Sequence, residues 1–484
     1  MKFISYIYVL FLGLILSSCS DNDNNYIPPA LDDPKNQETD EVYNDPDFTP
    51  HKDGEPYDSY RGLVMAGYQG WFGTPGDDCS HGDQWYHYQE RGMFEPGVLR
   101  NSIDFWPDVS EYEKKYDTNN FYYPNGQKAQ VYSSYDKSSI LLHFKWMKDY
   151  GIDGVFMQRF VSEVIDNPKG KDHFDKVLKS AMEGSNTYQR AICIMYDLSG
   201  SRPEQYQKVL DDAKTIMDNY QLLDRNAKQK FYLYENGKPL IVLWGVGFND
   251  NRPYSLTDVE QLMNGLKEKG FSIMLGVPTY WRDLNGDTMN DTKLHELVKK
   301  ADVIMPWFVG RYNKDSYPEK HDLIVKDIKW CKENDVEYAP LCFPGYADRN
   351  MHPNNTISPR YGGQFLWDQA YHCIKSGAQM LYIAMFDEID EGTAIFKCLN
   401  KKDVPDNIPS EDYYVLFKDN KYSVVNEKVE GLTGNNWCES AKELNVEFQG
   451  VEDEYSTDQY LWITGQAAKM LRGEIPLKSQ MPNR

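Results

Sequence analysis

Four carboxylates within five residues form the densest group of chemically capable side chains in this sequence of 484 residues. They stand in the stretch Asp387-Glu388-Ile389-Asp390-Glu391, directly after the apolar run Leu381–Phe386. Mutual repulsion and partial burial should raise the pKa of at least one of these acids. A carboxyl group that keeps its proton near neutral pH can act as a general acid. The cluster therefore predicts acid–base chemistry at this point of the chain.

The elements that would position these acids are apolar runs of the kind that form strands buried on both faces. The eight runs are Gly62–Phe72, Gly154–Phe160, Ala191–Tyr196, Leu240–Val246, Ser272–Tyr280, Val303–Val309, Tyr338–Pro344 and Gln379–Phe386. Between most of them, apolar residues recur at i, i+4 and i+7, as in Ile140, Phe144 and Met147, which predicts helices with one face on a sheet.

This alternation predicts an α/β fold, a (β/α)₈ TIM barrel that occupies residues 61–484 as one catalytic domain. Two long loops are expected, Thr74–Asp136 after the first strand and about Lys397–Tyr455 after the eighth. An open doubly wound sheet is the alternative, but no glycine-rich nucleotide loop follows a strand.

In a barrel of this kind, functional residues follow the C-terminal ends of the strands. The strand ends here carry aromatic, acidic and arginine side chains, which suit a sugar: rings stack on its apolar faces, and two acids in different protonation states cleave its glycosidic bond. The candidate substrate-binding residues are Tyr68, Trp71, Asp197, Tyr280, Trp281, Trp307, Arg311, Tyr346, Arg349 and Asp387. The first long loop adds aromatic residues that could line a groove, namely Trp85, Tyr86, His87, Tyr88 and Trp106.

Several of these features have other interpretations. The acidic run could be a solvated turn or a calcium site, although Ca²⁺ needs six to eight oxygens from a shaped loop and no such pattern is present. Arg159, Arg282, Arg311 and Arg349 could favour an acidic sugar or form ion pairs at the barrel rim. The position of the acids at the end of the eighth predicted strand favours catalysis.

At these residues the sequence resembles glycoside hydrolase families 71 and 99, which hold α-1,3-glucanases and endo-α-mannosidases, and their bacterial lipoprotein relatives. The resemblance covers most of residues 61–476. It rests on Tyr68-Gln69-Gly70-Trp71-Phe72-Gly73, on Tyr132-Ser133-Ser134 with Gly151-Ile152-Asp153-Gly154, on Gly237-Lys238-Pro239, on Pro344-Gly345-Tyr346, and most specifically on Glu388-x-x-Glu391-Gly392-Thr393.

The resemblance implies roles for individual residues. In family 99 the first glutamate of the pair assists the sugar 2-hydroxyl, which attacks the anomeric carbon and forms a 1,2-anhydro intermediate, so that configuration is retained. The second glutamate is the acid and then the base. By this resemblance, Glu388 takes the first role and Glu391 the second, while Tyr346, Arg349 and Asp197 bind sugar.

The N-terminus predicts export and anchoring. Residues 1–19 combine a basic start, an apolar stretch and Leu16-Ser17-Ser18-Cys19, which resembles a bacterial lipobox, so a lipoprotein signal peptide with lipidation at Cys19 is expected. An ordinary signal peptide is the alternative. Residues 20–60 hold twelve acids and two lysines and are expected to form a disordered tether, unless part of them packs on the barrel as an arm.

The net charge and the cysteine pattern disfavour several classes of function and site. The net charge of −22 disfavours nucleic-acid binding, since phosphates require a basic surface. Seven cysteines besides Cys19, without a Cys-x-x-Cys pair or a His-Glu-x-x-His motif, predict neither a disulfide framework nor a zinc cluster. We expect no metal and no organic cofactor, a monomer, a polysaccharide or oligosaccharide substrate, and an outer-membrane lipoprotein on the cell surface or periplasmic face.

The sequence thus predicts a glycosidase, an O-glycosyl hydrolase that cleaves an α-linked glycan, α-mannoside-like or related, with Glu388 and Glu391. The alternative is a non-catalytic, glycan-binding surface lipoprotein on a degenerate barrel. A purely structural surface protein would leave the convergence of acids and aromatic rings unexplained.

Overall fold

The computed structural model describes residues 51–52, 54–226 and 228–484. The expected signal peptide, Cys19 and most of the expected tether lie outside these residues. Within the described chain, no helix combines the length and apolar character needed to cross a membrane.

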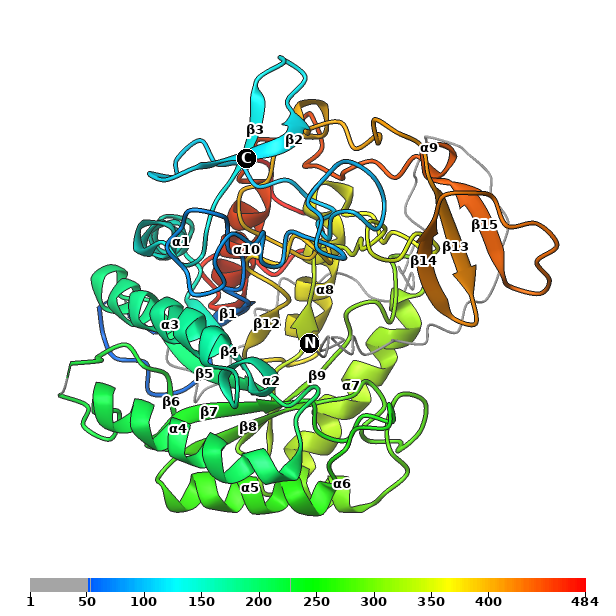
Figure 1. Cartoon of the computed structure of the whole chain (residues 1–484). Coiled ribbons are helices and arrows are strands. Elements are labelled where there is room, and N and C mark those ends of the chain that lie inside the picture. Colours follow the sequence, from blue (N-terminus) through cyan, green and yellow to red (C-terminus); the bar gives the residue numbers. More distant parts are fainter. Residues whose placement is uncertain (1–50, 53, 227) are drawn as a thin grey trace.

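A parallel sheet forms the centre of the molecule, and each of the expected apolar runs supplies a strand to it (Figure 1). In chain order the strands are β1 (Val64–Tyr68), β4 (Gly154–Phe160), β5 (Ala191–Asp197), β7 (Lys238–Trp244), β8 (Ser272–Val277), β9 (Val303–Pro306), β10 (Glu337–Tyr338) with β11 (Leu341–Cys342), and β12 (Leu381–Ile383). Almost all of their residues are buried, which fits the apolar runs seen in the sequence. A short strand, β6 (Tyr234–Glu235), pairs antiparallel with β7.

The seventh expected strand is split by Pro340, which has no N–H to donate. Its first part, β10, pairs with β9, and its second part, β11, pairs with β12. Because β10 and β11 are the two ends of the sheet path and are consecutive in the chain, the sheet closes on itself through this segment. The expected (β/α)₈ barrel is confirmed.

Helices surround this sheet (Figure 1). They are α1 (Lys137–Tyr150), α2 (Val161–Val164), α3 (Pro168–Tyr188), α4 (Tyr206–Tyr220), α5 (Leu256–Glu268), α6 (Lys293–Val298), α7 (Tyr317–Glu333), α8 (Gln364–Lys375) and α10 (Gln459–Leu471). In α1 the expected apolar positions Ile140, Phe144 and Met147 are all buried, and Gly151 ends the helix at a φ of 79°.

The two long loops carry structure of their own. The first holds a hairpin of β2 (Tyr116–Tyr122) and β3 (Lys128–Val131), and the second holds a three-stranded sheet of β13 (Tyr414–Lys418), β14 (Lys421–Val425) and β15 (Trp437–Ser440), followed by α9 (Ala441–Leu444) (Figure 1). Trp106, a candidate groove residue, is instead fully buried between the loops, 5.0 Å from the Phe121 ring and 5.2 Å from the Phe448 ring.

The last part of the expected tether packs on the barrel. Tyr57 and Tyr60 are fully buried, and their hydroxyls donate to Gln189 O at 3.0 Å and Leu381 O at 2.8 Å. The Tyr60 N–H also donates to the Glu235 carboxylate at 2.9 Å. This stretch is therefore the extended arm that the sequence left open as the alternative to a free tether.

The seven cysteines in the described chain are all buried and unpaired, as expected of small apolar side chains.

Candidate active site

The carboxylates after β12 meet the residues after β1, because these two strands are neighbours in the barrel. Their parallel register pairs Ala66 with Ile383, so the chain beyond each strand reaches the same end of the barrel. Asp387 is fully buried there, and its two oxygens accept the backbone N–H groups of Gln69 and Gly70 at 2.7 and 2.8 Å. Burial raises the pKa of Asp387 to about 7. Asp387 was a candidate for sugar binding, but both oxygens hold backbone and the side chain has no exposed surface.

Glu388 is held by two side-chain donors. Gln69 donates an amide N–H to Glu388 Oε1, and the Thr393 hydroxyl donates to Oε2 at 2.8 Å. Glu388 is only 4% exposed, and burial together with the neighbouring Asp390 raises its pKa to about 8. The two donors act in the opposite direction, since they stabilise the ionised carboxylate.

Glu391 is half-buried and has a different environment. No side-chain hydrogen bond to its carboxylate occurs within the described residues. Burial and repulsion from Glu388 and Asp348 raise its pKa well above the usual range, although His352 and Arg311 act against this. Of the two glutamates, Glu391 is the one whose surroundings favour a retained proton.

Asp390 stands between the glutamates in sequence and is also buried. Its Oδ1 atom has no hydrogen-bond partner in the described part of the chain. Burial and repulsion from Glu391 raise its pKa, and its proximity in turn raises that of Glu388. Burial and mutual repulsion thus disfavour the simultaneous ionisation of Glu388, Asp390 and Glu391.

The segment after β11 lies against this cluster. The Ala347 N–H donates to Glu391 O at 2.9 Å. Tyr346 donates its hydroxyl to Asp348 Oδ2 at 2.8 Å, and the pKa of Tyr346 is raised by burial and by the nearby Glu391. His352 also binds Asp348, at 2.7 Å, and this contact outweighs burial and raises the pKa of His352. The expected sugar residue Tyr346 is therefore next to the acid pair.

Two aromatic groups lie at other strand ends. The half-buried Trp71, after β1, stacks on His87 at 4.0 Å and on Phe160, the last residue of β4, at 5.1 Å. At the ends of β7 and beyond β9, Trp244 and Trp307 meet edge to face at 5.2 Å. Trp71 and Trp307 are both half-buried, so both residues keep some exposed surface at these strand ends.

The polar candidate residues at these strand ends make contacts within the protein. Asp197 is buried and accepts the Ser199 N–H at 2.7 Å; burial raises its pKa, and Arg252 counteracts this. Arg311 donates to Asp287 at 3.0 Å, which is the rim ion pair considered from the sequence. Arg349 is half-buried, and its backbone N–H donates to Asp104 at 2.9 Å.

Three predicted sugar residues have partners within the protein. Tyr68 is fully buried, and its hydroxyl contacts His143 Nδ1 at 2.6 Å. Trp281 is also fully buried, with its indole N–H donating to Asp327 of α7 at 3.2 Å. The Tyr280 hydroxyl accepts from Lys320. Consecutive side chains around a strand end point in different directions, so a strand end in the sequence does not identify the inward member.

Arg159 forms a buried ion pair instead of a sugar contact. Its guanidinium donates to both Asp212 oxygens, at 2.9 and 2.8 Å, and is 1% exposed. Arg282 is similarly engaged with Asp327 at 2.8 Å.

Removal of the partner of Arg159 should destabilise the fold. Asp212→Ala leaves the Arg159 charge buried without its main partner, so we expect a loss of about 3–5 kcal/mol in unfolding free energy, measured by denaturant titration. Lys171→Ala is the matched control: Lys171 also pairs with Asp212 but is 46% exposed, and its loss should cost below about 1 kcal/mol. Equal effects of the two substitutions would contradict a special role of the buried pair.

Gln69, Thr393 and His352 were not predicted as site residues, yet each acts on the pKa of one of the two glutamates. Gln69 directly precedes Gly70-Trp71, and Thr393 closes the Glu-x-x-Glu-Gly-Thr motif, so both stood in the motifs that carried the resemblance. Nothing in the local sequence marks His352.

A change at Thr393 should alter the pH profile of activity. Thr393→Val removes a donor to Glu388 Oε2 at nearly unchanged volume, which disfavours the ionised form and raises the Glu388 pKa further. If ionised Glu388 is the base, the rising limb of kcat/KM moves to higher pH, by about one unit. Thr464→Val, which alters a buried hydroxyl on α10, is the control and should leave the limb in place. An unmoved limb in Thr393→Val would show that Glu388 does not set it.

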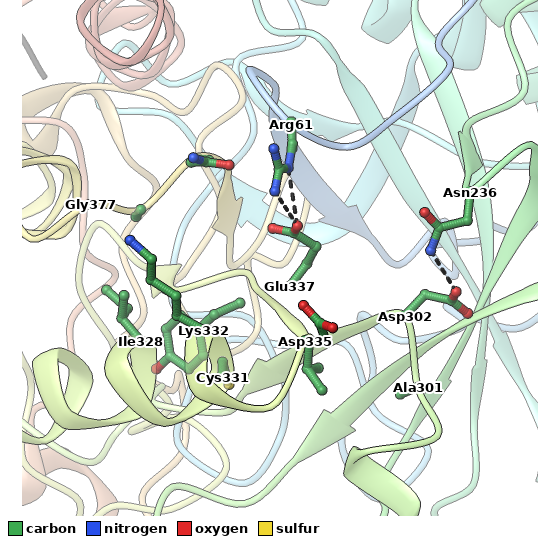
Figure 2. A pocket seen from close by; sticks show the side chains of 14 residues that line it. Arg61, Asn236, Ala301, Asp302, Ile328, Cys331, Lys332, Asp335, Glu337 and Gly377 are labelled. Atoms are coloured by element: carbon green, nitrogen blue, oxygen red, sulfur yellow. Dashed lines mark hydrogen bonds and ion pairs between the residues drawn. The ribbon is translucent and has the colours of Figure 1, made fainter. Parts of the chain in front are cut away.

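A hollow of about 510 Å³ lies at the other end of the barrel. Figure 2 shows Arg61 paired with Glu337 and Asn236 with Asp302 in its wall. These residues precede or begin strands, and in barrel enzymes that end serves stability while chemistry occurs at the opposite end. We assign no catalytic role to this hollow.

Curated proteins similar in sequence to this chain include glycoprotein endo-α-1,2-mannosidases. No model of a known protein family matches the sequence. The rat glycoprotein endo-α-1,2-mannosidase is 22% identical over 351 residues, which cover 70% of this chain and 69% of that protein. The human glycoprotein endo-α-1,2-mannosidase-like protein is 22% identical over 355 residues, with coverage of 70% and 69%.

The fold is similar to that of a solved endo-α-mannosidase structure. The structure of the family 99 endo-α-mannosidase from Bacteroides thetaiotaomicron matches with a TM-score of 0.54 and 15% sequence identity, over 86% of this chain and 99% of that one. The rat and bacterial proteins are named as glycosidases, in line with the glycosidase predicted from the sequence. The expected resemblance is confirmed: this chain is similar in sequence to the endo-α-1,2-mannosidases and in fold to a glycoside hydrolase of family 99.

Proposed function

We propose that this protein is a glycoside hydrolase that cleaves an internal α-mannosidic bond in a polysaccharide or oligosaccharide. One observation carries the proposal: two glutamates three residues apart lie at the C-terminal end of the barrel, with raised pKa values and unequal hydrogen bonding. Glycoside hydrolysis requires such a pair, one carboxyl ionised and the other protonated.

The hydrogen bonds support a division of labour between the two. Glu388 accepts from Gln69 and Thr393, and these donors make it the more readily ionised of the two glutamates, so it serves as the base that takes the proton of the sugar 2-hydroxyl. Glu391 has no such donors and keeps its proton, so it serves as the acid that protonates the leaving oxygen. After departure, Glu391 is ionised and can activate the incoming water.

This chemistry selects among α-linked sugars. In an α-mannoside, the 2-hydroxyl and the leaving oxygen lie on opposite faces of the ring, so the 2-oxygen can displace the leaving group from behind. In an α-glucoside, the two lie on the same side and this displacement is blocked. The names of the relatives, which are endo-α-mannosidases, support the same substrate class and cleavage within a chain.

A glycan panel tests the proposal. The full chain is incubated with α-mannans, α-glucans and acidic glycans, and released reducing ends are measured alongside binding by calorimetry. We expect release from an α-mannan and none from α-glucans. Binding to a glycan without any release would identify the protein as a glycan-binding lipoprotein on a degenerate barrel and refute the hydrolase.

We also propose that the protein is a lipoprotein of the outer membrane, on the cell surface or periplasmic face. The lipobox-like Leu16-Ser17-Ser18-Cys19 and the acidic residues that follow support this. Metabolic labelling with a palmitate analogue should label the wild-type chain and not Cys19→Ala. Equal labelling of both, or of neither, would contradict lipidation at Cys19.

A further inference from the structure

A cysteine and two histidines come together beside the C-terminal end of β1. Cys79 and His81 belong to the long loop after β1, and His173 lies near the start of α3. Each offers one potential ligand atom, and these atoms lie within 4.8 Å of one another. We propose that Cys79, His81 and His173 bind a divalent transition-metal ion, Zn²⁺ in first place.

The distance between two of the ligands fits zinc. Bond lengths of about 2.3 Å to sulfur and 2.0 Å to nitrogen in a tetrahedral site separate the two ligand atoms by about 3.5 Å. Cys79 Sγ and His173 Nδ1 are 3.3 Å apart. This pair can therefore hold an ion nearly as it stands, and His81 needs a small shift to complete the site.

The second nitrogen of His173 is arranged as in metal-binding histidines. His173 Nε2 lies 2.9 Å from Gly70 O, and a carbonyl oxygen can only accept, so Nε2 carries the proton. In the neutral ring, Nδ1 then presents its lone pair toward Cys79. Metal-binding histidines almost always donate their other N–H to a carbonyl or carboxylate in this way.

His81 supplies an independent observation. Its ring is held by stacking on Tyr86 at 3.7 Å between ring centres. Its Nε2 atom is buried, yet no hydrogen-bond partner for it exists among the described residues. Buried side-chain nitrogens are normally satisfied, and a metal ion in the adjacent space would satisfy this one.

Charged side chains lie close to the three ligand candidates. The negative charges of Asp77 and Asp172 act on both Cys79 and His81, and the positive charge of Lys169 acts on His81 in the opposite direction. When the metal binds, the Cys79 thiol releases its proton to solvent and the sulfur binds as a thiolate.

This proposal departs from the sequence-based expectation of no zinc cluster and no metal, because no known metal-binding motif joins the three residues. Cys79 and His173 are 94 residues apart, and the fold alone joins them. The ion would fasten the loop to α3 and, through the His173–Gly70 contact, to the backbone that Asp387 holds. Its role is thus to position the strand end beside the acids and the Trp71–His87 stack.

Metal content tests the proposal without reference to catalysis. The full chain is loaded with Zn²⁺, desalted, and analysed by inductively coupled plasma mass spectrometry, in parallel with His81→Ala, His173→Ala and the control His321→Ala, a half-buried histidine on α7. We expect about one Zn²⁺ per chain in the wild type and the control, and at least about tenfold less in the two site variants. Equal zinc in all four proteins, or none in the wild type, would overturn the proposal.

A measurement on the unmodified chain covers the case in which a variant does not fold. Co²⁺ added to the wild type should produce an absorption band from charge transfer between the thiolate and the metal. Bound Zn²⁺ should slow the alkylation of Cys79 at least about tenfold in buffer without denaturant, and the alkylation of Cys438 serves as the internal reference. No absorption and an unchanged rate at Cys79 would show that Cys79 and His173 form a hydrogen-bonded pair without metal.

Discussion

The variant Glu391→Gln is expected to lower kcat on an α-mannan by about a hundred- to ten-thousand-fold. The glutamine keeps the size of the side chain but has no proton to give to the leaving oxygen. Glu391 makes no side-chain hydrogen bond within the described residues, so the substitution breaks no contact that holds the site. The measurement is the initial rate of reducing-end release, with folding checked by circular dichroism.

The matched control for this variant is Glu235→Gln. Glu235 is also buried, and burial also raises its pKa, but it lies on β6 and binds Ser59 and Tyr60 of the N-terminal arm. We expect near wild-type turnover from this protein. Full activity of Glu391→Gln would show that Glu391 is not the acid.

The variant Glu388→Gln is expected to reduce turnover by a similar or larger factor, for a different reason. The glutamine cannot ionise, so the sugar 2-hydroxyl loses its base, while the amide can still accept from Gln69. Substrate binding should persist, because the change leaves the aromatic groups in place. The measurement is kcat on the same α-mannan, together with the dissociation constant by calorimetry.

The pH profile of kcat/KM distinguishes the role of Glu388 from that of Glu391. Loss of the base should remove the rising limb of kcat/KM, while loss of the acid should remove the falling limb. Loss of binding together with turnover in Glu388→Gln would contradict its role as the base, since it would indicate a structural part in holding the strand end.

Most of the fold could be predicted from the sequence because local patterns determine it. Strands buried on both faces are near-continuous apolar runs, and β4 matches its expected run, Gly154–Phe160, residue for residue. The seventh strand differed because Pro340 interrupts the ladder, although the proline is visible in the sequence. The burial of Tyr57 and Tyr60 matched only the alternative to a free tether, because their acidic neighbourhood favoured a disordered segment.

The candidate site was less predictable, because contacts between distant segments decide it. Glu388 receives its donor from Gln69, 319 residues away, and the metal candidate joins residues 94 apart. The direction in which a side chain points at a strand end was also not predictable from the sequence. Tyr68 and Trp71 belong to one motif, yet the first faces His143 in the core and the second lies in the aromatic stack.

The central claim is that Glu388 and Glu391 divide the chemistry of one bond cleavage. An α-mannosyl fluoride extended at its non-reducing end tests it most directly, since fluoride departs without a proton from the protein. Glu391→Gln should recover most of its turnover on the fluoride relative to a natural α-mannoside, while Glu388→Gln should stay inactive on both. Equal losses of the two variants on both substrates would contradict the assignment.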